Sequence, residues 1–326
     1  MNFDDRINIA NILSSKDDFL SLENVIESII NKKCIAFIGA GLSVSEGYPT
    51  WDSLILGSYE NGSLTKDGLL QYVGLTNSDI PIDKKDDLME VSELCKLKDI
   101  NKYYDFIIDK FGKGNSLLKY GINHTTIWRI PFQSVLTTNF DSCLYDAASN
   151  DNRLHKIFVS PVLSHNPECG YLYHLHGIAF ELDDKRNYKE TIVLSASEYA
   201  EYYNSSMNDL MILFYKVLSE YSLLYVGFSM NDINVKKIMK HTNTLLLQRK
   251  SLALKKLQEN IDIMSSYILL PEQEVNLNLV DELLQLNINV ISYKPQSDFS
   301  GLQKLLFHIY NKTNGTPLLQ PGISLR

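Results

Sequence analysis

The segment that decides the fold is Cys34-Ile-Ala-Phe-Ile38, which is followed at once by Gly39-Ala-Gly-Leu-Ser43. Five consecutive apolar residues that end at a glycine are typical of a strand buried on both faces of a parallel sheet. The two glycines permit a tight turn and allow a phosphate to approach the backbone amides. Residue 44 is Val, so the third glycine of the dinucleotide-binding pattern is missing. A tight turn without a ligand therefore also explains this segment.

Strands and helices alternate along the rest of the chain. Further strands are predicted at 134–138, 172–176, 191–194, 223–226, 267–270 and 288–293. Helices are predicted at 21–33, 141–149, 196–203, 207–219, 233–262, 272–285 and 299–311, with several short helices between about 52 and 130. This order predicts an α/β fold: a parallel sheet with helices on both faces plus a helical insertion. Ligands of such sheets bind at the carboxyl ends of the strands.

Composition limits the classes of partner and compartment. The chain has 326 residues and a net charge of −8, which argues against nucleic-acid binding because such proteins normally carry a basic surface. The polar start MNFDDRINIA does not resemble a signal peptide, and no apolar run reaches the roughly 18 residues that span a membrane. We therefore expect a cytoplasmic protein without membrane contact.

Four cysteines are present, and they do not form a metal-binding pattern. Cys34, Cys95, Cys143 and Cys169 include no C-x-x-C pair, so the sequence predicts free thiols and no metal site.

A polar run, Thr137-Thr-Asn-Phe-Asp141, ends the predicted strand at 134–138. Unpaired buried polar groups cost about 1–3 kcal/mol, so these side chains must find protein partners or face a ligand. Asn139 or Asp141 can also cap the following helix, and that interpretation requires no ligand. Both interpretations stay open at this point.

Two more strand ends carry residues of interest. Histidines alternate in Tyr173-His-Leu-His-Gly177, so their side chains face opposite sides of the sheet and cannot share a metal ion. His176 stands at the strand end and is the candidate for the cleft, whereas His174 is expected in the core. Gly227-Phe-Ser229 follows another buried strand, and Asn231 or Asp232 can cap the helix after it. The predicted site therefore combines four strand ends.

Taken in order, these segments resemble the sirtuin (silent information regulator 2) superfamily. The matching pieces are Gly39–Ser43, Gly47-Tyr-Pro-Thr-Trp51, Thr137–Asp141, His176-Gly177 and Gly227–Ser229. The resemblance covers residues from about 30 to 235 and continues more loosely to about 310. It implies a Rossmann-like domain at residues 21–326, preceded by an N-terminal extension at 1–20.

The resemblance also implies roles for individual residues. Asn139 and His176 would be catalytic: Asn139 would orient water or the ribose hydroxyls, and His176 would be the general base. The implied NAD-binding residues are Gly39, Ala40, Gly41, Ser43, Pro49, Trp51, Thr138, Asp141, Gly227 and Ser229.

Departures from the deacylating sirtuins narrow the expected activity. Those enzymes carry a four-cysteine zinc module, which this chain lacks, and they commonly have Gln where this chain has Thr138. The pattern looks like the bacterial sirtuin-like effectors of anti-phage defence, which hydrolyse and deplete NAD⁺. That resemblance implies NAD⁺ as substrate, no metal, a homo-oligomer, and a partner ATPase or other defence subunit. The alternatives are a non-catalytic NAD- or ADP-ribose-binding sensor or scaffold, and an NAD⁺-dependent protein deacylase.

Overall fold

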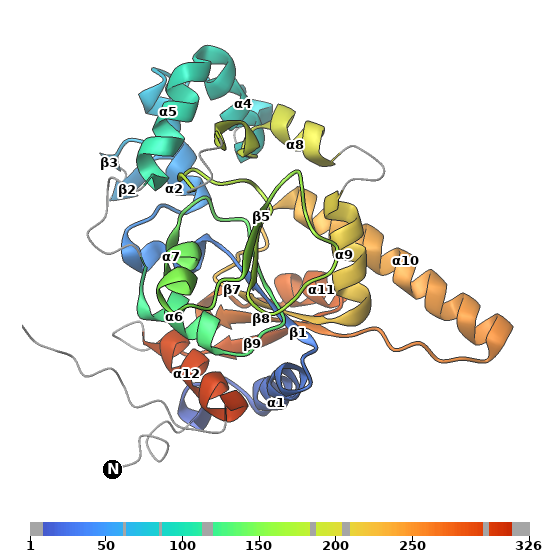
Figure 1. Ribbon diagram of the computed structural model, residues 1–326. Helices are drawn as coiled ribbons and strands as arrows, with labels where there is room; N and C mark the ends of the chain where they lie inside the picture. The colour runs from blue at the N-terminus through green and yellow to red at the C-terminus, as the bar shows by residue number, and fades with distance from the viewer. Residues whose placement is uncertain are drawn as a thin grey trace, which may run out of the picture.

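A seven-stranded parallel sheet forms the centre of the molecule (Figure 1). The computed structural model describes residues 9–60, 63–84, 87–112, 120–182, 187–203, 209–295 and 300–314. The strand order is β5-β6-β4-β1-β7-β8-β9, and each neighbouring pair is parallel. The strands are β1 (Cys34–Ile38), β4 (Val135–Thr137), β5 (Lys156–Val159), β6 (Tyr171–His174), β7 (Ser222–Val226), β8 (Ser266–Pro271) and β9 (Ile288–Tyr293). The parallel sheet predicted from the sequence is confirmed.

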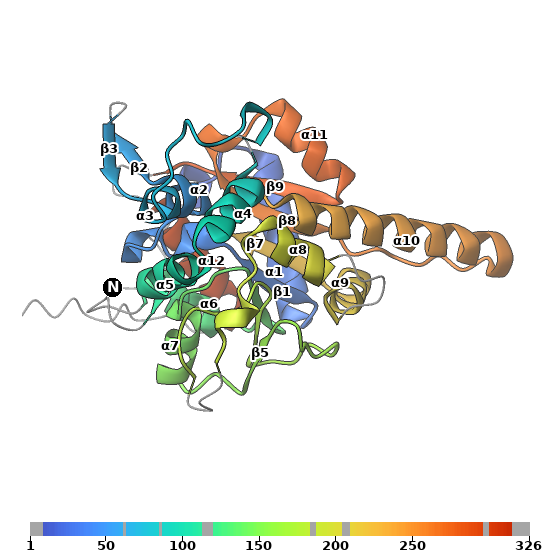
Figure 2. The same ribbon diagram turned by 90° about the horizontal axis from the view of Figure 1, so that it is seen from above.

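Helices cover both faces of this sheet (Figures 1 and 2). One face packs against α1 (Lys16–Ile30), α6 (Ile122–Arg129), α7 (Cys143–Asn150) and α12 (Gly301–Asn314). The other packs against α9 (Asp209–Glu220), α10 (Ile233–Leu257) and α11 (Leu277–Gln285). The doubly covered sheet explains why β1 is apolar at every position.

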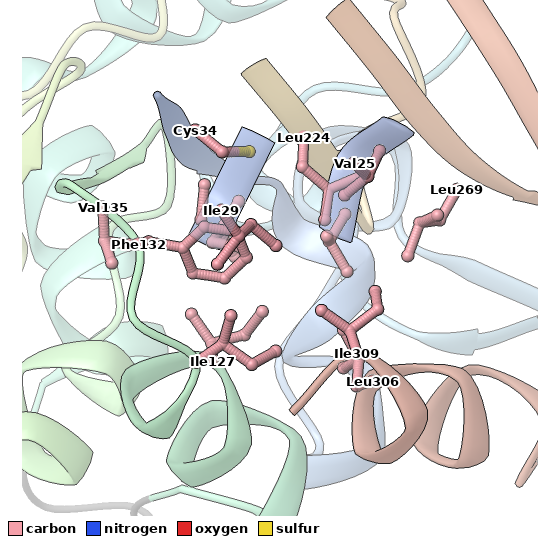
Figure 3. Close-up of a cluster of buried hydrophobic side chains, with 14 of the residues drawn as sticks. Val25, Ile29, Cys34, Ile127, Phe132, Val135, Leu224, Leu269, Leu306 and Ile309 are labelled. Carbon is pink, nitrogen blue, oxygen red and sulfur yellow. The ribbon is translucent and has the colours of Figure 1, made fainter. Parts of the chain in front are cut away.

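Strand β1 divides its side chains between the two apolar cores. Ala36 and Ile38 join the core on the α1 side, whereas Ile35 and Phe37 join the core on the α10 side, as strand alternation requires. Figure 3 shows the α1-side core, including residues of α1, α6 and α12. Each fully buried large aliphatic or aromatic side chain contributes about 1.5–3 kcal/mol to folding.

The insertion between β1 and α6 forms a separate layer. It contains α2 (Trp51–Leu56), α3 (Leu69–Tyr72), α4 (Leu88–Lys98) and α5 (Ile100–Phe111), with an unpredicted hairpin of β2 (Ser58–Glu60) and β3 (Ser63–Lys66). Its apolar core includes Phe140, Ile192 and Leu194 from the main domain. The insertion therefore packs against the segments that follow β4 and β6.

Several predicted boundaries differ from the structure. Helix α1 begins at Lys16 rather than at residue 21, because the Ser15 hydroxyl accepts a hydrogen bond from the Asp18 amide and caps it. The division of the chain after residue 20 stays a prediction. Helix α10 ends at Leu257, before a left-handed Gln258, and α11 begins at Leu277 rather than at 272. Residues 207, 208 and 299, where two helices were predicted to start, lie outside the described residues.

Two strand predictions need correction. The strand predicted at 191–194 is wrong: η6 (Lys189–Thr191) is a 3₁₀ helix and irregular chain follows it. The Val193 amide does bond to the His176 carbonyl, so this segment lies beside the end of β6 without joining the sheet. Strand β5 was not predicted, because it lies at the sheet edge with exposed and half-buried side chains and lacks a buried-strand pattern.

The glycine turn after β1 packs directly against the turn after β7. A Cβ atom on Gly39 would lie 2.4 Å from the Gly227 carbonyl oxygen, and one on Gly41 would lie 2.9 Å from that same oxygen. The Gly41 amide donates to this oxygen at 2.8 Å. Glycine is therefore required here for backbone packing. The turn continues into two short 3₁₀ helices, η3 (Ala40–Leu42) and η4 (Val44–Glu46), and not into an α-helix.

The Gly227→Ala substitution should lower the thermal unfolding midpoint markedly. Gly227 has φ +63°, and a Cβ there would lie 2.4 Å from the Leu42 amide nitrogen. Gly74→Ala is a matched control, because Gly74 also has positive φ (+83°) but has open space around its Cβ position. Overpacking should cost about 1–3 kcal/mol beyond the conformational strain that both variants share. Equal unfolding midpoints for the two variants would contradict the steric argument.

Candidate active site

One cavity of about 360 Å³ opens at the carboxyl ends of the strands. Eleven of the twelve residues predicted for the site line it: Ala40, Gly41, Ser43, Pro49, Trp51, Thr138, Asn139, Asp141, His176, Gly227 and Ser229. Gly39 is not among the lining residues. Its carbonyl oxygen instead accepts a hydrogen bond from the Asn139 side chain.

Strands β4 and β6 bring Asn139 and His176 to the same part of the cavity. Thr137 and His174 are paired in the sheet, and each of the two candidate residues lies two positions beyond its paired residue. The peptide after Thr137 is fixed because the Thr137 hydroxyl donates to the Ile38 carbonyl and accepts from the Asn139 amide. Asn139 and His176 therefore line the same cavity because they follow the ends of two neighbouring strands, as expected for residues at the carboxyl ends of parallel strands.

The Asn139 side chain is held in one orientation. Its Nδ2 donates to the Gly39 carbonyl at 3.2 Å and to the Ser43 hydroxyl at 3.4 Å. Because a carbonyl oxygen only accepts, the amide nitrogen must face Gly39. Oδ1 is buried and has no hydrogen-bond partner among the described residues. An unpartnered acceptor on a cavity-lining side chain is suited to a hydroxyl or water of a ligand.

His124 supports this arrangement and was missed by the sequence analysis. Its Nδ1 accepts from the Gly121 amide at 3.2 Å, so the neutral ring carries its proton on Nε2. That nitrogen lies 3.2 Å from the Ser43 hydroxyl and donates to it. Ser43 is 1% exposed, and its hydroxyl connects the His124 ring to the Asn139 side chain. The only sequence signal for His124 was its place near the start of a helix, which does not point to a site.

His176 lies in a buried corner of the cavity beside two tyrosines and an acid. Nε2 is 2.6 Å from the Tyr203 hydroxyl and 3.6 Å from Asp232 Oδ2. Nδ1 is 3.5 Å from the Tyr199 hydroxyl. Burial lowers the pKa of His176, and the Asp232 carboxylate partly opposes this effect. The ring is therefore neutral near pH 7 and able to accept a proton.

His174 is the core histidine that the alternation predicted. It is fully buried, and its Nδ1 lies 3.0 Å from the Asn139 carbonyl oxygen, to which it donates. The ring supports the Asn139 backbone from the side opposite the cavity.

The predicted capping roles are distributed over two acids. Asp141 Oδ1 accepts from the Cys143 amide at the start of α7, and Asp232 Oδ1 accepts from the Asn234 and Val235 amides at the start of α10. Asp141 and Asp232 also line the cavity. Capping and cavity lining are therefore not exclusive for these residues.

Residues 133–291 match the family model of the SIR2-like domain. The chain is similar to this family over that region. Its matched region includes Asn139, His176 and Asp232, so the family match covers three strand ends of the cavity. The first glycine turn, at Gly39–Ser43, lies before the matched residues.

Curated proteins that are similar to this chain are named NAD(+) hydrolase ThsA. The one from Bacillus cereus (strain MSX-D12) is 24% identical over 226 residues, which are 68% of this chain and 42% of the relative. The one from Enterococcus faecium is 22% identical over 304 residues, which are 88% and 58% of the two chains. This chain thus spans about half the length of the curated relatives it matches. A solved structure from work on the "Structural Basis for the Mechanism and Regulation of Sir2 Enzymes" aligns over 92% of this chain and 99% of its own, with 14% identity and a TM-score of 0.44.

The described part of the chain contains no group of three or more His, Cys, Asp or Glu side chains arranged to hold a metal ion. Cys34, Cys95 and Cys143 are buried free thiols, and Cys169 is an exposed one. Among the described residues, every helix is too short or too polar to cross a membrane.

The stability of the protein should decrease on acidification below pH 6.5. Burial lowers the pKa of His174 from 6.5 to about 4, so below pH 6.5 the unfolded chain binds a proton that the folded chain excludes. Burial also lowers the pKa values of His124 and His176. The free energy of unfolding should therefore be highest above pH 6.5 and fall towards pH 4, with about 3 kcal/mol attributable to His174.

Urea unfolding midpoints measured across this pH window would check that dependence. His174→Gln should show a shallower decrease than the wild type, whereas the exposed His241→Gln should keep the wild-type slope. A midpoint that does not vary with pH would contradict a buried neutral imidazole at position 174.

Proposed function

We propose that this chain is an NAD⁺ hydrolase that cleaves the bond between nicotinamide and ribose. The observation that carries the proposal is the convergence of Asn139, with its unpartnered Oδ1, and the neutral imidazole of His176 on one cavity. Support also comes from the similarity to proteins named NAD(+) hydrolase ThsA. Neither observation requires a metal ion, and we propose that the reaction uses none.

The shape of the cavity supports a dinucleotide as substrate. Its lining runs along the sheet edge from His176 after β6, past Ala40 after β1 and Ser229 after β7, to Leu270 and Tyr293 in β8 and β9. We assign the nicotinamide ribose to the Asn139 and His176 end. The phosphates are assigned to Ala40, Gly41, Ser43, Gly227 and Ser229.

The four predicted site residues that are not yet assigned are placed at the nicotinamide end. Pro49, Trp51, Thr138 and Asp141 line the cavity beside Asn139 in this assignment. The Trp51 ring centroid lies 6.3 Å from that of Tyr199, and its Nε1 is buried without a partner among the described residues. This N–H group is a donor available to a carboxamide or hydroxyl oxygen.

Nicotinamide leaves as a neutral molecule, so the reaction needs no general acid at the leaving group. The transition state resembles an oxocarbenium ion, and the protein must position the sugar and deliver water. In our proposal Asn139 Oδ1 accepts a hydrogen bond from water or a ribose hydroxyl. His176 accepts the proton that this hydroxyl or water releases.

Incubation of the purified chain with NAD⁺ tests the proposal. We expect nicotinamide and an ADP-ribose product to appear without any acylated peptide, and chromatography would separate ADP-ribose from its cyclic form. Saturable NAD⁺ binding without nicotinamide release, with and without candidate partner proteins, would favour a binding subunit. Release that requires an acyl-lysine peptide would instead indicate a deacylase.

We further propose that this activity serves bacterial anti-phage defence in the cytoplasm by depleting NAD⁺, alone or with a partner ATPase or other defence subunit. The support is the sequence resemblance to bacterial defence effectors that deplete NAD⁺, together with the similarity to relatives named NAD(+) hydrolase. Expression of the chain in bacteria should lower cellular NAD⁺ after phage infection, and an unchanged NAD⁺ level would count against this role.

We also propose a homo-oligomer in which α10 contacts a second copy. The end of α10 extends away from the rest of the molecule (Figures 1 and 2) and exposes Leu247, Leu254 and Leu257. Residues 241–257 contain four Lys or Arg and no Asp or Glu, whereas the whole chain has a net charge of −8. A basic, apolar helix is complementary to an acidic surface of the same protein. A monomeric mass in light scattering would contradict this assembly.

A further inference from the structure

Three groups beside His176 take no part in the mechanism described so far. They are Asp232 after β7, and Tyr199 and Tyr203 of α8 (Ala196–Tyr203). Asp232 is 6% exposed, Tyr199 4% and His176 4%. In the strand order, β4 and β1 lie between β6, which carries His176, and β7, which leads to Asp232. The fold thus brings a carboxylate from a distant strand end to this imidazole.

The two oxygens of Asp232 have separate partners. Oδ1 accepts from the first amides of α10 at 2.9 and 3.0 Å, which is sufficient for a helix cap. Oδ2 accepts from the Tyr199 hydroxyl at 2.7 Å and lies 3.6 Å from His176 Nε2. Capping therefore accounts for only one oxygen, and the other faces the imidazole.

The hydrogen-bond partners around His176 can accommodate its protonated form. Because the Tyr199 hydroxyl gives its proton to Asp232, its oxygen is left to accept from His176 Nδ1. The Tyr203 oxygen can accept from Nε2 at 2.6 Å. Burial raises the pKa values of both tyrosines well above their ordinary range, so both stay hydroxyls. Both N–H groups of an imidazolium would find an oxygen acceptor, and its charge would face a carboxylate.

Helix α8 is itself anchored, which holds Tyr199 in place. The buried carboxylate of Glu198 accepts from the Leu194 and Ser195 amides and from the Tyr103 and Tyr104 hydroxyls. Lys96 of α4 pairs with it at 2.9 Å. The tyrosines beside His176 are therefore fixed to the helical insertion as well as to the sheet.

We propose that Asp232, acting directly and through the Tyr199 hydroxyl, is the positioning residue that stabilises the His176 imidazolium formed during NAD⁺ hydrolysis. This inference rests on the proposed function. The proton passes from the attacking water, or from a ribose hydroxyl, to an imidazole nitrogen, and then to solvent after the product forms. Asp232 remains ionised and Tyr199 remains protonated throughout, so neither gains nor loses a proton.

The Asp232→Asn variant separates this role from helix capping, because Asn caps a helix about as well as Asp but carries no charge. Loss of the nearby carboxylate should lower the pKa of His176 by about one unit or more. NMR titration of the histidine ring in the ligand-free protein, with His176→Gln used for assignment, measures this shift without any turnover. Asp232, Tyr199 and Tyr203 are the titratable groups that face His176 among the described residues.

Kinetic measurements give the second readout. In Asp232→Asn, kcat for nicotinamide release should fall about 10–100-fold with little change in KM, and the acid limb of the pH profile should move to lower pH. Tyr199→Phe should also lower kcat and move the acid limb of the pH profile to lower pH, but both changes should be smaller than in Asp232→Asn. Tyr202→Phe is the matched control on the same helix, since the Tyr202 hydroxyl points to the Glu190 carbonyl.

The two readouts distinguish failure of this inference from failure of the proposed function. An unshifted His176 pKa in a folded Asp232→Asn protein would overturn the role of Asp232, whatever the activity. A raised KM with unchanged kcat would assign Asp232 to substrate binding and would also overturn it. A shifted pKa in a wild type that releases no nicotinamide would leave Asp232 as the group that sets the charge of His176 and refute only the hydrolase.

Discussion

Nicotinamide release should fall roughly 100-fold or more when Asn139 is replaced by Ala, because the ribose and water would lose the group that orients them. The side chain is 6% exposed and is held by the Gly39 carbonyl and the Ser43 hydroxyl. Its Oδ1 is buried and has no hydrogen-bond partner among the described residues, and Asn139 lines the cavity. Initial rates with saturating NAD⁺ would measure the loss as a decrease in kcat.

Two further variants make this result specific. Asn139→Asp keeps an oxygen towards the cavity but sets a second oxygen against the Gly39 carbonyl, so it should also lose most activity. Asn150→Ala removes an exposed amide on α7, outside the cavity lining, and should retain wild-type rates. Thermal unfolding would show that the Asn139 variants are folded. Wild-type turnover by folded Asn139→Ala would remove this residue from the mechanism.

The sequence predicted every strand of the seven-stranded sheet except β5, and it predicted most of the residues that line the cavity at the sheet edge. Cys34–Ile38 is apolar at every position because both faces of β1 are covered. This pattern can be recognised in the sequence without knowing which helices cover the strand. Since the carboxyl ends of parallel strands share one edge, Asn139 and His176 could be placed at that edge, and the family resemblance implied that they act together. The alternation of His174 and His176 likewise gave one core and one cavity side chain.

Side chains from α6 and from α8 could not be placed in this way. His124 reaches Ser43 from a helix more than eighty residues along the chain, and Tyr199 reaches His176 from α8. Helical periodicity indicates which residues are buried but not which neighbour they contact. The close packing of Gly39 against the Gly227 turn could not be predicted either, because the sequence does not show which two turns meet.

Replacement of His176 by Ala should reduce kcat about 10²–10⁴-fold, the usual contribution of a general base. Burial lowers the pKa of His176 below 6.5, and a base must be unprotonated to act. The wild-type rate should therefore be constant near pH 7 and fall on acidification through that lowered pKa. In His176→Ala this acid limb should disappear together with most of the activity.

The His176→Ala variant must be compared with a variant of a histidine that lies outside the cavity. His241→Ala changes an exposed ring on α10 and should preserve both the rate and the acid limb. Removal of His176 also leaves the Tyr203 hydroxyl without the nitrogen at 2.6 Å, so unfolding midpoints are needed for both proteins. Since burial of the neutral imidazole opposes protonation while Asp232 favours it, the position of the acid limb reports the balance between these two effects. An acid limb that persists unchanged in an active His176→Ala protein would assign the proton transfer to another group.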